Sequence, residues 1–115
     1  MKIENAEIKA TQLGVEDHGI FSFSIFMDGE GWGTWFGGIT LDGYDKEKDC
    51  RIGWDKAIPM LTEIMNVVGV RNWEDLKGKL VRVEVGRLSE KITKIGNIFK
   101  NEWFDLDDWV NKYED

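Results

Sequence analysis

The ten residues at positions 29–38, GEGWGTWFGG, constrain the fold more than any other part of this chain. They contain five glycines and three large aromatic residues. Each glycine inside a strand or helix costs roughly 0.5–1 kcal/mol relative to alanine, because folding removes more backbone freedom from it. That cost indicates unusual backbone angles or a close backbone approach. The segment is therefore expected to be either a bent core strand or a binding surface.

The remaining sequence is typical of an ordinary globular protein. The 115 residues are expected to form one compact domain over positions 1–115, because a chain of this length buries about two thirds of its unfolded surface. Cys50 is the only cysteine, which excludes an internal disulfide and favours a reducing, cytoplasmic location. No apolar run approaches the roughly 20 residues that cross a bilayer, so no membrane partner is expected.

The charge pattern bears on the class of partner. The formal net charge is −7, with an acidic excess before position 54 and after position 101 and a basic excess between them. Binding to duplex DNA needs clustered basic side chains that displace counterions from phosphate. The acidic balance therefore argues against direct duplex binding and favours attraction to basic protein surfaces. Alternation along the predicted strands disperses the basic side chains of 77–100 over both faces.

Alternating hydrophobicity predicts three strands in the first part of the chain. The first is expected at Ala6–Ala10, with one face formed by Ala6, Ile8 and Ala10. The second follows a polar turn that includes Gly14 and positions 16–19, and its apolar residues are Phe21, Phe23, Ile25 and Met27. A tight turn at Asp28-Gly29 leads into the third, whose core face is expected to carry Trp35, Gly37, Ile39 and Leu41.

The second half of the chain predicts helices and a hairpin. Positions 42–49 are polar and are expected to form a loop. The main helix is expected to begin between Lys56 and Ile58 and to end at Gly69, with an apolar stripe of Ile58, Leu61, Ile64, Met65 and Val68. After it we expect a single helical turn near Trp73 and strands at 80–85 and 91–98. The last expected element is a helix over Leu106–Tyr113, capped by Asp105. The expected fold is α+β: a mainly antiparallel sheet of about five strands with one principal helix on one face and a short C-terminal helix.

Several of these segments together resemble a family of small phage- and prophage-encoded proteins of unknown function. The similarity covers roughly positions 3–105 and is carried by LGVEDHGI at 13–20, GWG at 31–33, FGG at 36–38, WEDLKGK at 73–79 and IGNI at 95–98. The sequence departs from the family at Trp32–Trp35, where a Gly-Gln-Gly type of sequence is usual. The resemblance implies an accessory protein that acts in an infected bacterial cell, and the departure makes an aromatic contact at Trp32 or Trp35 particular to this chain.

The residues give no basis for catalysis, a cofactor or a bound metal. His18 is the only histidine and lies beside Glu16 and Asp17, but neighbouring side chains in a turn point in different directions and no nucleophile is identifiable. The acidic run from Asp42 to Asp49 does not have the ligand spacing of an EF-hand. The glycine run lacks the Gly-Lys-Ser/Thr sequence of a phosphate-binding loop. The chain is therefore predicted not to be an enzyme.

The remaining hypotheses are three kinds of binding function. The first is an anti-CRISPR-like or DNA-mimic-like inhibitor of a host defence protein, such as a nucleic-acid-handling enzyme, with aromatic anchors and acidic rim charges. Its predicted contact residues are Trp32, Tyr44, Trp103, Asp42, Asp45 and Asp49. The second is a pocket for a nucleotide signal, lined by the glycine and aromatic segment. The third is a homo-oligomeric structural or assembly factor with an exposed edge strand or tryptophan patch as the self-contact.

Overall fold

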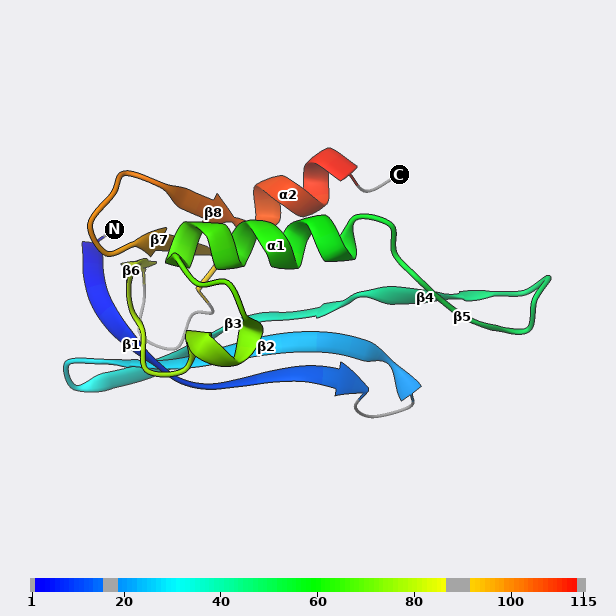
Figure 1. Ribbon diagram of the computed structural model, residues 1–115, viewed down its shortest axis with the longest axis horizontal. Helices are drawn as coiled ribbons and strands as arrows, with labels where there is room; N and C mark the ends of the chain where they lie inside the picture. Colours follow the sequence, from blue (N-terminus) through cyan, green and yellow to red (C-terminus); the bar gives the residue numbers. More distant parts are fainter. Residues whose placement is uncertain (1, 16–18, 87–91, 114–115) are drawn as a thin grey trace.

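The computed structural model describes residues 2–15, 19–86 and 92–113 and confirms the α+β class (Figure 1). Its elements are β1 (Lys2–Val15), β2 (Phe21–Gly29), β3 (Trp32–Thr40), β4 (Asp42–Asp45), β5 (Cys50–Gly53), α1 (Ala57–Val68), the 3-10 turn η2 (Trp73–Leu76), β6 (Leu80–Val85), β7 (Lys94–Asn97), β8 (Trp103–Asp105) and α2 (Leu106–Tyr113). Neither helix in these ranges is long and apolar enough to cross a membrane.

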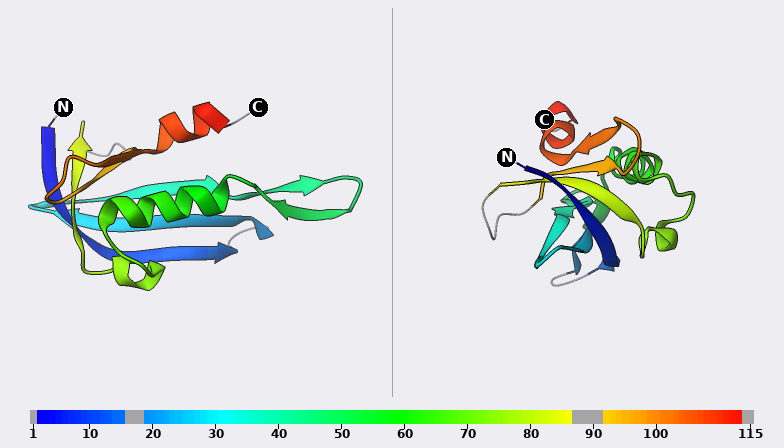
Figure 2. Two further views of the ribbon diagram at one scale, coloured as in Figure 1. Left: turned by 45° about the horizontal axis from the view of Figure 1, so that its top comes forward. Right: turned by 90° about the vertical axis from the view of Figure 1, so that its left-hand side faces the viewer.

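Strand β1 joins the two halves of the main sheet. The sheet has six antiparallel strands in the order β3-β2-β1-β6-β7-β8, and β4 and β5 form a second, two-stranded sheet. Residues Lys2–Glu7 of β1 pair with β6, whereas Glu7–Val15 pair with β2. An isolated bridge between Phe36 and Ile92 brings edge strand β3 to the chain that precedes β7. The sheet therefore curls around a core, as the end-on view shows (Figure 2).

Helix α1 fills the inside of this curled sheet. It runs from Ala57 to Val68, and Gly69 closes it with φ +97° and an amide that donates to the Met65 carbonyl at 2.8 Å, so the predicted bounds and glycine cap are confirmed. The predicted stripe is wrong at Ile58, which is 71% exposed. Ile58 lies in the first turn, where the helix has just left the β4–β5 hairpin.

Aromatic rings connect the elements through the core. Phe36 of β3 lies 6.2 Å from both Phe23 and Phe104 by ring centroid, and Phe104 lies 5.7 Å from Trp109. These contacts place α2 on the same core as β2 and β3. The predicted C-terminal helix is confirmed, with the Asp108 amide donating to the Asp105 carboxylate at 3.0 Å as a cap.

Two bulges change which side chains face the core. In β3, Gly37 pairs with Ser24 while Ile39 pairs with Phe23, which leaves Gly38 as an extra residue with φ +74°. An extra residue shifts the alternation by one position. Phe36 is therefore fully buried and Trp35 is 41% exposed, so the prediction that Trp35 faces the core is wrong. The predictions for the residues beyond the bulge hold: Leu41 is buried and Ile39 is half-buried.

The bulge in β1 has the same effect. Ile8 pairs with Met27 and Ala10 with Phe26, which leaves Lys9 unpaired in the ladder. Ala6 and Ile8 are buried as predicted, but Ala10 is exposed because it lies beyond the extra residue. The strand is also longer than expected: Gly14, which was placed in a turn, belongs to β1.

Two further segments differ from the sequence prediction. Positions 42–49, predicted as a loop, contain strand β4 and a turn, because Asp42–Asp45 pair with Cys50–Gly53 although both strands are largely exposed. Strand β8 was not predicted, because its three residues are too few to show alternation. It completes the sixth position of the main sheet by pairing with β7.

The bulge in β3 predicts a specific sensitivity to alanine. Gly38 has a left-handed φ, and an added Cβ would overlap the Trp35 ring, so Gly38→Ala should lower the free energy of unfolding by at least about 1–2 kcal/mol. Urea denaturation followed by circular dichroism measures this.

The matched control is Gly43→Ala, because Gly43 has no heavy atom within 4 Å of the added Cβ and no left-handed φ. Its unfolding free energy should stay within about 0.5 kcal/mol of the parent. Equal stability of the two variants would contradict the role assigned to the bulge.

Candidate functional site

The β4–β5 hairpin projects from the body along the long axis of the molecule (Figure 1). We call residues 42–53 the arm. The molecule measures 48 × 26 × 25 Å, and the arm contributes to the long dimension. Two backbone hydrogen bonds attach its ends to the body. The Leu41 amide donates to the Phe21 carbonyl at 2.7 Å, and the Trp54 amide donates to the Leu41 carbonyl at 2.8 Å.

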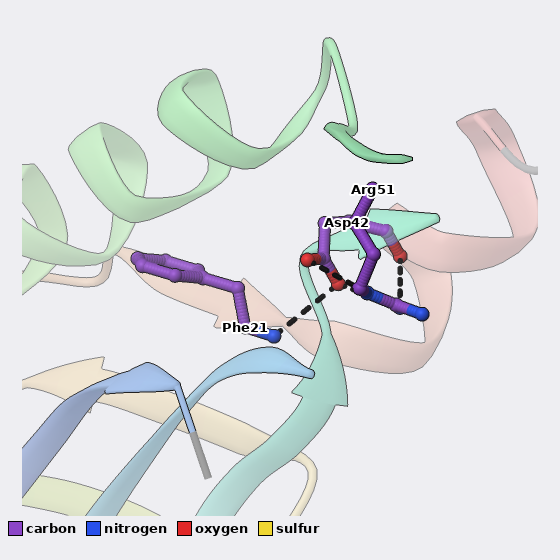
Figure 3. A network of polar contacts seen from close by, with 3 residues as sticks. All are labelled: Phe21, Asp42 and Arg51. Atoms are coloured by element: carbon purple, nitrogen blue, oxygen red, sulfur yellow. Dashed lines mark hydrogen bonds and ion pairs between the residues drawn. The ribbon is translucent and has the colours of Figure 1, made fainter. Parts of the chain in front are cut away.

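An ion pair closes the base of the arm (Figure 3). The Arg51 guanidinium donates to both carboxylate oxygens of Asp42, with Nη2 at 2.8 Å and Nε at 3.0 Å. The same carboxylate accepts the Phe21 amide of β2 at 3.3 Å. The hydrogen bond from Arg51 holds the pKa of Asp42 below its usual value, and the reverse interaction raises the pKa of Arg51. Asp42 thereby joins the two strands of the arm through Arg51 and joins the arm to the main sheet through the Phe21 amide.

The other two predicted aspartates organise the tip of the arm. The Asp45 carboxylate accepts the Glu47 and Lys48 amides at 2.9 and 3.2 Å, which is an Asx turn. The Tyr44 hydroxyl donates to the Asp49 carboxylate, and this bond raises the pKa of Tyr44. All three carboxylates that sequence reasoning placed at a partner contact therefore bond to groups within or beside the arm.

Apolar surface remains exposed on both faces of the arm. Tyr44 lies opposite Arg51 and Ile52 lies opposite Gly43, so the register places Tyr44 and Ile52 on opposite faces. Both side chains are exposed. Because the arm is only two strands wide, its two faces are both open to a partner.

A hollow of about 270 Å³ lies where the arm leaves the body. The residues that line it are mostly apolar and come from β2, the arm base and the first turns of α1: Phe21, Leu41, Trp54, Ala57, Ile58 and Leu61. Asp42 and Gly53 complete the wall. Exposed Ile58 belongs to this hollow, so arm and hollow form one continuous surface with apolar side chains and a carboxylate that Arg51 neutralises.

Trp32 lies on a different part of the molecule. It is half-buried, packs against the core and covers Gly29 across the β2–β3 turn, where an added Cβ would overlap its ring. Its indole Nε1 is buried and meets no hydrogen-bond partner among the described residues. Figure 1 shows the β2–β3 turn at the end of the molecule opposite to the arm. Trp32 therefore does not join Tyr44 in one contact surface.

Trp103 begins strand β8 and lies flat on Gly96, where an added Cβ would meet the ring at 2.7 Å. The Arg82 guanidinium and the Lys94 ammonium lie 5.0 and 5.8 Å from its ring centroid. Arg82 also donates to the carbonyls of Asn97 and Lys100 at 2.7 and 2.6 Å. Two of the basic residues in the 77–100 stretch thus converge on one tryptophan, whereas Arg87 and Lys91 lie outside the described residues.

Sequence reasoning missed several exposed apolar side chains, among them Ile58 and Phe99. Ile58 was assigned to the buried stripe because its spacing fits that stripe. Phe99 was not singled out, yet it is 92% exposed on a turn in which Asn97 accepts the Phe99 and Lys100 amides at 2.8 Å each. The sequence signal for that turn is Asn97, a residue that favours Asx turns.

The acidic residues of the arm form no metal-binding cluster among the described residues. Within 2–15, 19–86 and 92–113, no three His, Cys, Asp or Glu side chains gather as metal ligands. Cys50 is exposed on the arm and unpaired. His18, considered above as a general base, lies outside the described residues together with Glu16 and Asp17.

Comparison with known proteins gives no significant match to a family model, a curated protein or a solved structure. The functional interpretation therefore rests on the geometry of the arm and the hollow.

Acidification should release the base of the arm. The folded-state pKa of Asp42 is lowered, so the stability from this ion pair is complete above the unfolded value of about 3.9 and is lost as the pH falls through the folded value. Two-dimensional ¹H–¹⁵N NMR should show the Arg51 Nε–H signal retained from neutral pH to about 4 and broadened or shifted at lower pH.

Asp42→Asn provides the comparison at constant pH. It removes the charge but keeps the shape, so at neutral pH its Arg51 Nε–H signal should match that of the parent protein at the acid end of the titration. Unchanged arm resonances in Asp42→Asn would show that the ion pair does not hold the arm.

Proposed function

We propose that the arm and the hollow bind a protein partner, and that the chain is a phage or prophage accessory protein that inhibits this partner in the cytoplasm of an infected bacterial cell. The observation that carries the binding proposal is the apolar hollow beneath a projecting, internally bonded arm. The phage setting comes from the sequence resemblance, and the partner class it favours is a host defence or nucleic-acid-handling protein, as for anti-CRISPR proteins and DNA mimics.

The hollow suits one large apolar side chain of a partner. Its volume of about 270 Å³ accommodates an aliphatic or aromatic group, and its walls are the side chains of β2 and α1. Covering exposed Ile58 at the same time adds apolar burial worth about 1.5–3 kcal/mol for a side chain of this size. A central apolar pocket surrounded by polar groups is the usual form of a binding hot spot.

The internal hydrogen bonds of the arm favour tight binding. Ordering a loop on association costs about 0.5–1.5 kcal/mol for each side chain that is immobilised. Asp42, Asp45 and Asp49 each bond within or beside the arm before any partner arrives. Tyr44 and Ile52 are therefore presented from a backbone that needs little further ordering.

Charge has a secondary role in this proposal. Residues 42–58 contain the acidic Asp42, Asp45, Glu47, Asp49 and Asp55 and the basic Lys46, Lys48, Arg51 and Lys56. Opposite charges are thus interspersed along the arm and the start of α1. Such interspersed charges affect the association rate and specificity more than the affinity, so the anchor of this site is apolar.

A nucleotide-binding role has less support. The glycine segment, which would have to approach phosphate groups, lies within the ladder between β2 and β3. The hollow presents mostly apolar side chains, and its one charged lining residue, Asp42, is already paired with Arg51, so it offers no free cation for a phosphate group.

Quantitative affinity capture from phage-infected cells tests the proposed site. The baits are the parent protein, Ile58→Asp and the matched control Ile3→Asp, because Ile3 is 56% exposed but lies on β1 away from the hollow. A genuine partner should be recovered equally by the parent and Ile3→Asp, and at least about tenfold less by Ile58→Asp.

The recovered protein is then purified and its activity is titrated with each bait. Inhibition by the parent and by Ile3→Asp, and its loss with Ile58→Asp, is the expected result. If no protein distinguishes Ile58→Asp from the other two baits while all three are folded by circular dichroism, the hollow is not the contact site. If a partner is captured through the hollow but stays fully active, the proposed binding site is supported and the proposed inhibition is contradicted.

A further inference from the structure

Half of strand β1 has an unpaired edge. On one side, β1 pairs with β2 as far as Val15. On the other side, pairing with β6 ends at Glu7, and Ile8 makes the last contacts, with its amide donating to Lys79 at 2.9 Å and its carbonyl accepting from Gly78 at 2.7 Å. In the described ranges no strand pairs with this side beyond Ile8. The open edge at 10–15 is about 20 Å long at 3.4 Å per residue.

The open edge lacks the usual protection against pairing. Natural edge strands carry charged residues, prolines or bulges that prevent another strand from adding. The bulge at Lys9 lies at the start of the edge, and the six residues that follow are Ala10, Thr11, Gln12, Leu13, Gly14 and Val15. None of these six is charged or proline. Among the described residues η2 contacts β1, but no strand occupies this edge beyond Ile8, so its later residues can receive a further strand.

The edge is complementary to a second copy of itself. Thr11, Leu13 and Val15 lie opposite Ile25, Phe23 and Phe21 of β2, so they share the core-side face of the sheet. A twofold axis perpendicular to the sheet pairs odd-numbered residues with odd-numbered residues, which places exposed Leu13 and Val15 of one copy against the same apolar row of the other. Identical edges that meet in this way also bring no like charges together, because the six residues are uncharged.

We infer that two copies of this chain associate through antiparallel pairing of their β1 edges at residues 11–15. The contact makes one continuous sheet from the two main sheets, and it uses backbone hydrogen bonds with a small apolar row on one face. A symmetric dimer with a self-complementary interface is the commonest form of homo-oligomer.

This inference does not depend on the proposed function. In Figure 1 the arm extends in the direction in which β1 runs, so antiparallel β1 strands direct the two arms away from each other. The dimer therefore carries two copies of the binding surface.

Sedimentation equilibrium and hydrogen exchange test the dimer together. With rising concentration, up to about 1 mM, the parent should approach twice the chain mass, and amides within 11–15 should become protected from exchange in the same range. Leu13→Lys places identical charges near each other across the axis and should abolish both effects. The matched control Ile3→Lys lies on the half of β1 that β6 already covers and should retain them.

A second variant keeps the test decisive if Leu13→Lys fails to fold. If Leu13→Lys loses its circular dichroism spectrum, Val15→Lys, at the more exposed end of the edge, should give the same loss of dimer with the fold intact. A parent that stays monomeric throughout the concentration range overturns the inference, as does a dimer that persists in the folded Leu13→Lys or Val15→Lys variant. Protection of 11–15 only when a captured host protein is present assigns the edge to that protein and also overturns it.

Discussion

The extra residue at Gly38 is the constraint on which the rest of the structure depends. By shifting the alternation of β3, it places Phe36 at the centre of the aromatic core and still directs Leu41 inward at the far end of the strand. The amide of buried Leu41 donates to the Phe21 carbonyl, and its carbonyl accepts from the Trp54 amide. These two bonds fix the two ends of the arm. The next residue, Asp42, can then reach both Arg51 and β2. A single bulge thus links the core to the projecting arm.

Much of the fold could be predicted from local sequence, because helix limits and turns depend on nearby residues. The glycine after Val68 ends α1 and the Asp105 carboxylate caps α2, as their positions in the sequence indicated. The faces of Ala10 and Trp35 could not be predicted, because an extra residue next to each segment shifts the alternation and its position depends on pairing with β2. The double glycine at 37–38 is the one local signal of such a bulge.

The candidate site was predicted in part. Tyr44, Asp42, Asp45 and Asp49 do lie together, on an arm where a loop was expected, but the hydrogen bonds of the aspartates could not be known before β4 was paired with β5. Trp32 and Trp103 lie elsewhere. The hollow was beyond sequence reasoning, since it joins residues from three elements, and Ile58 has the spacing of a buried residue. Charged side chains thus organise the arm, and the contact that we propose with a partner is apolar.

The central claim is that the arm is a preformed element and not a loop that becomes ordered on binding. Backbone ¹⁵N relaxation of the free protein tests this most directly. For a preformed arm, we expect order parameters for the amides of β4 and β5 close to those of β2, at about 0.85 as in rigid backbone. Values below about 0.6 across the arm, with β2 remaining rigid, would contradict it.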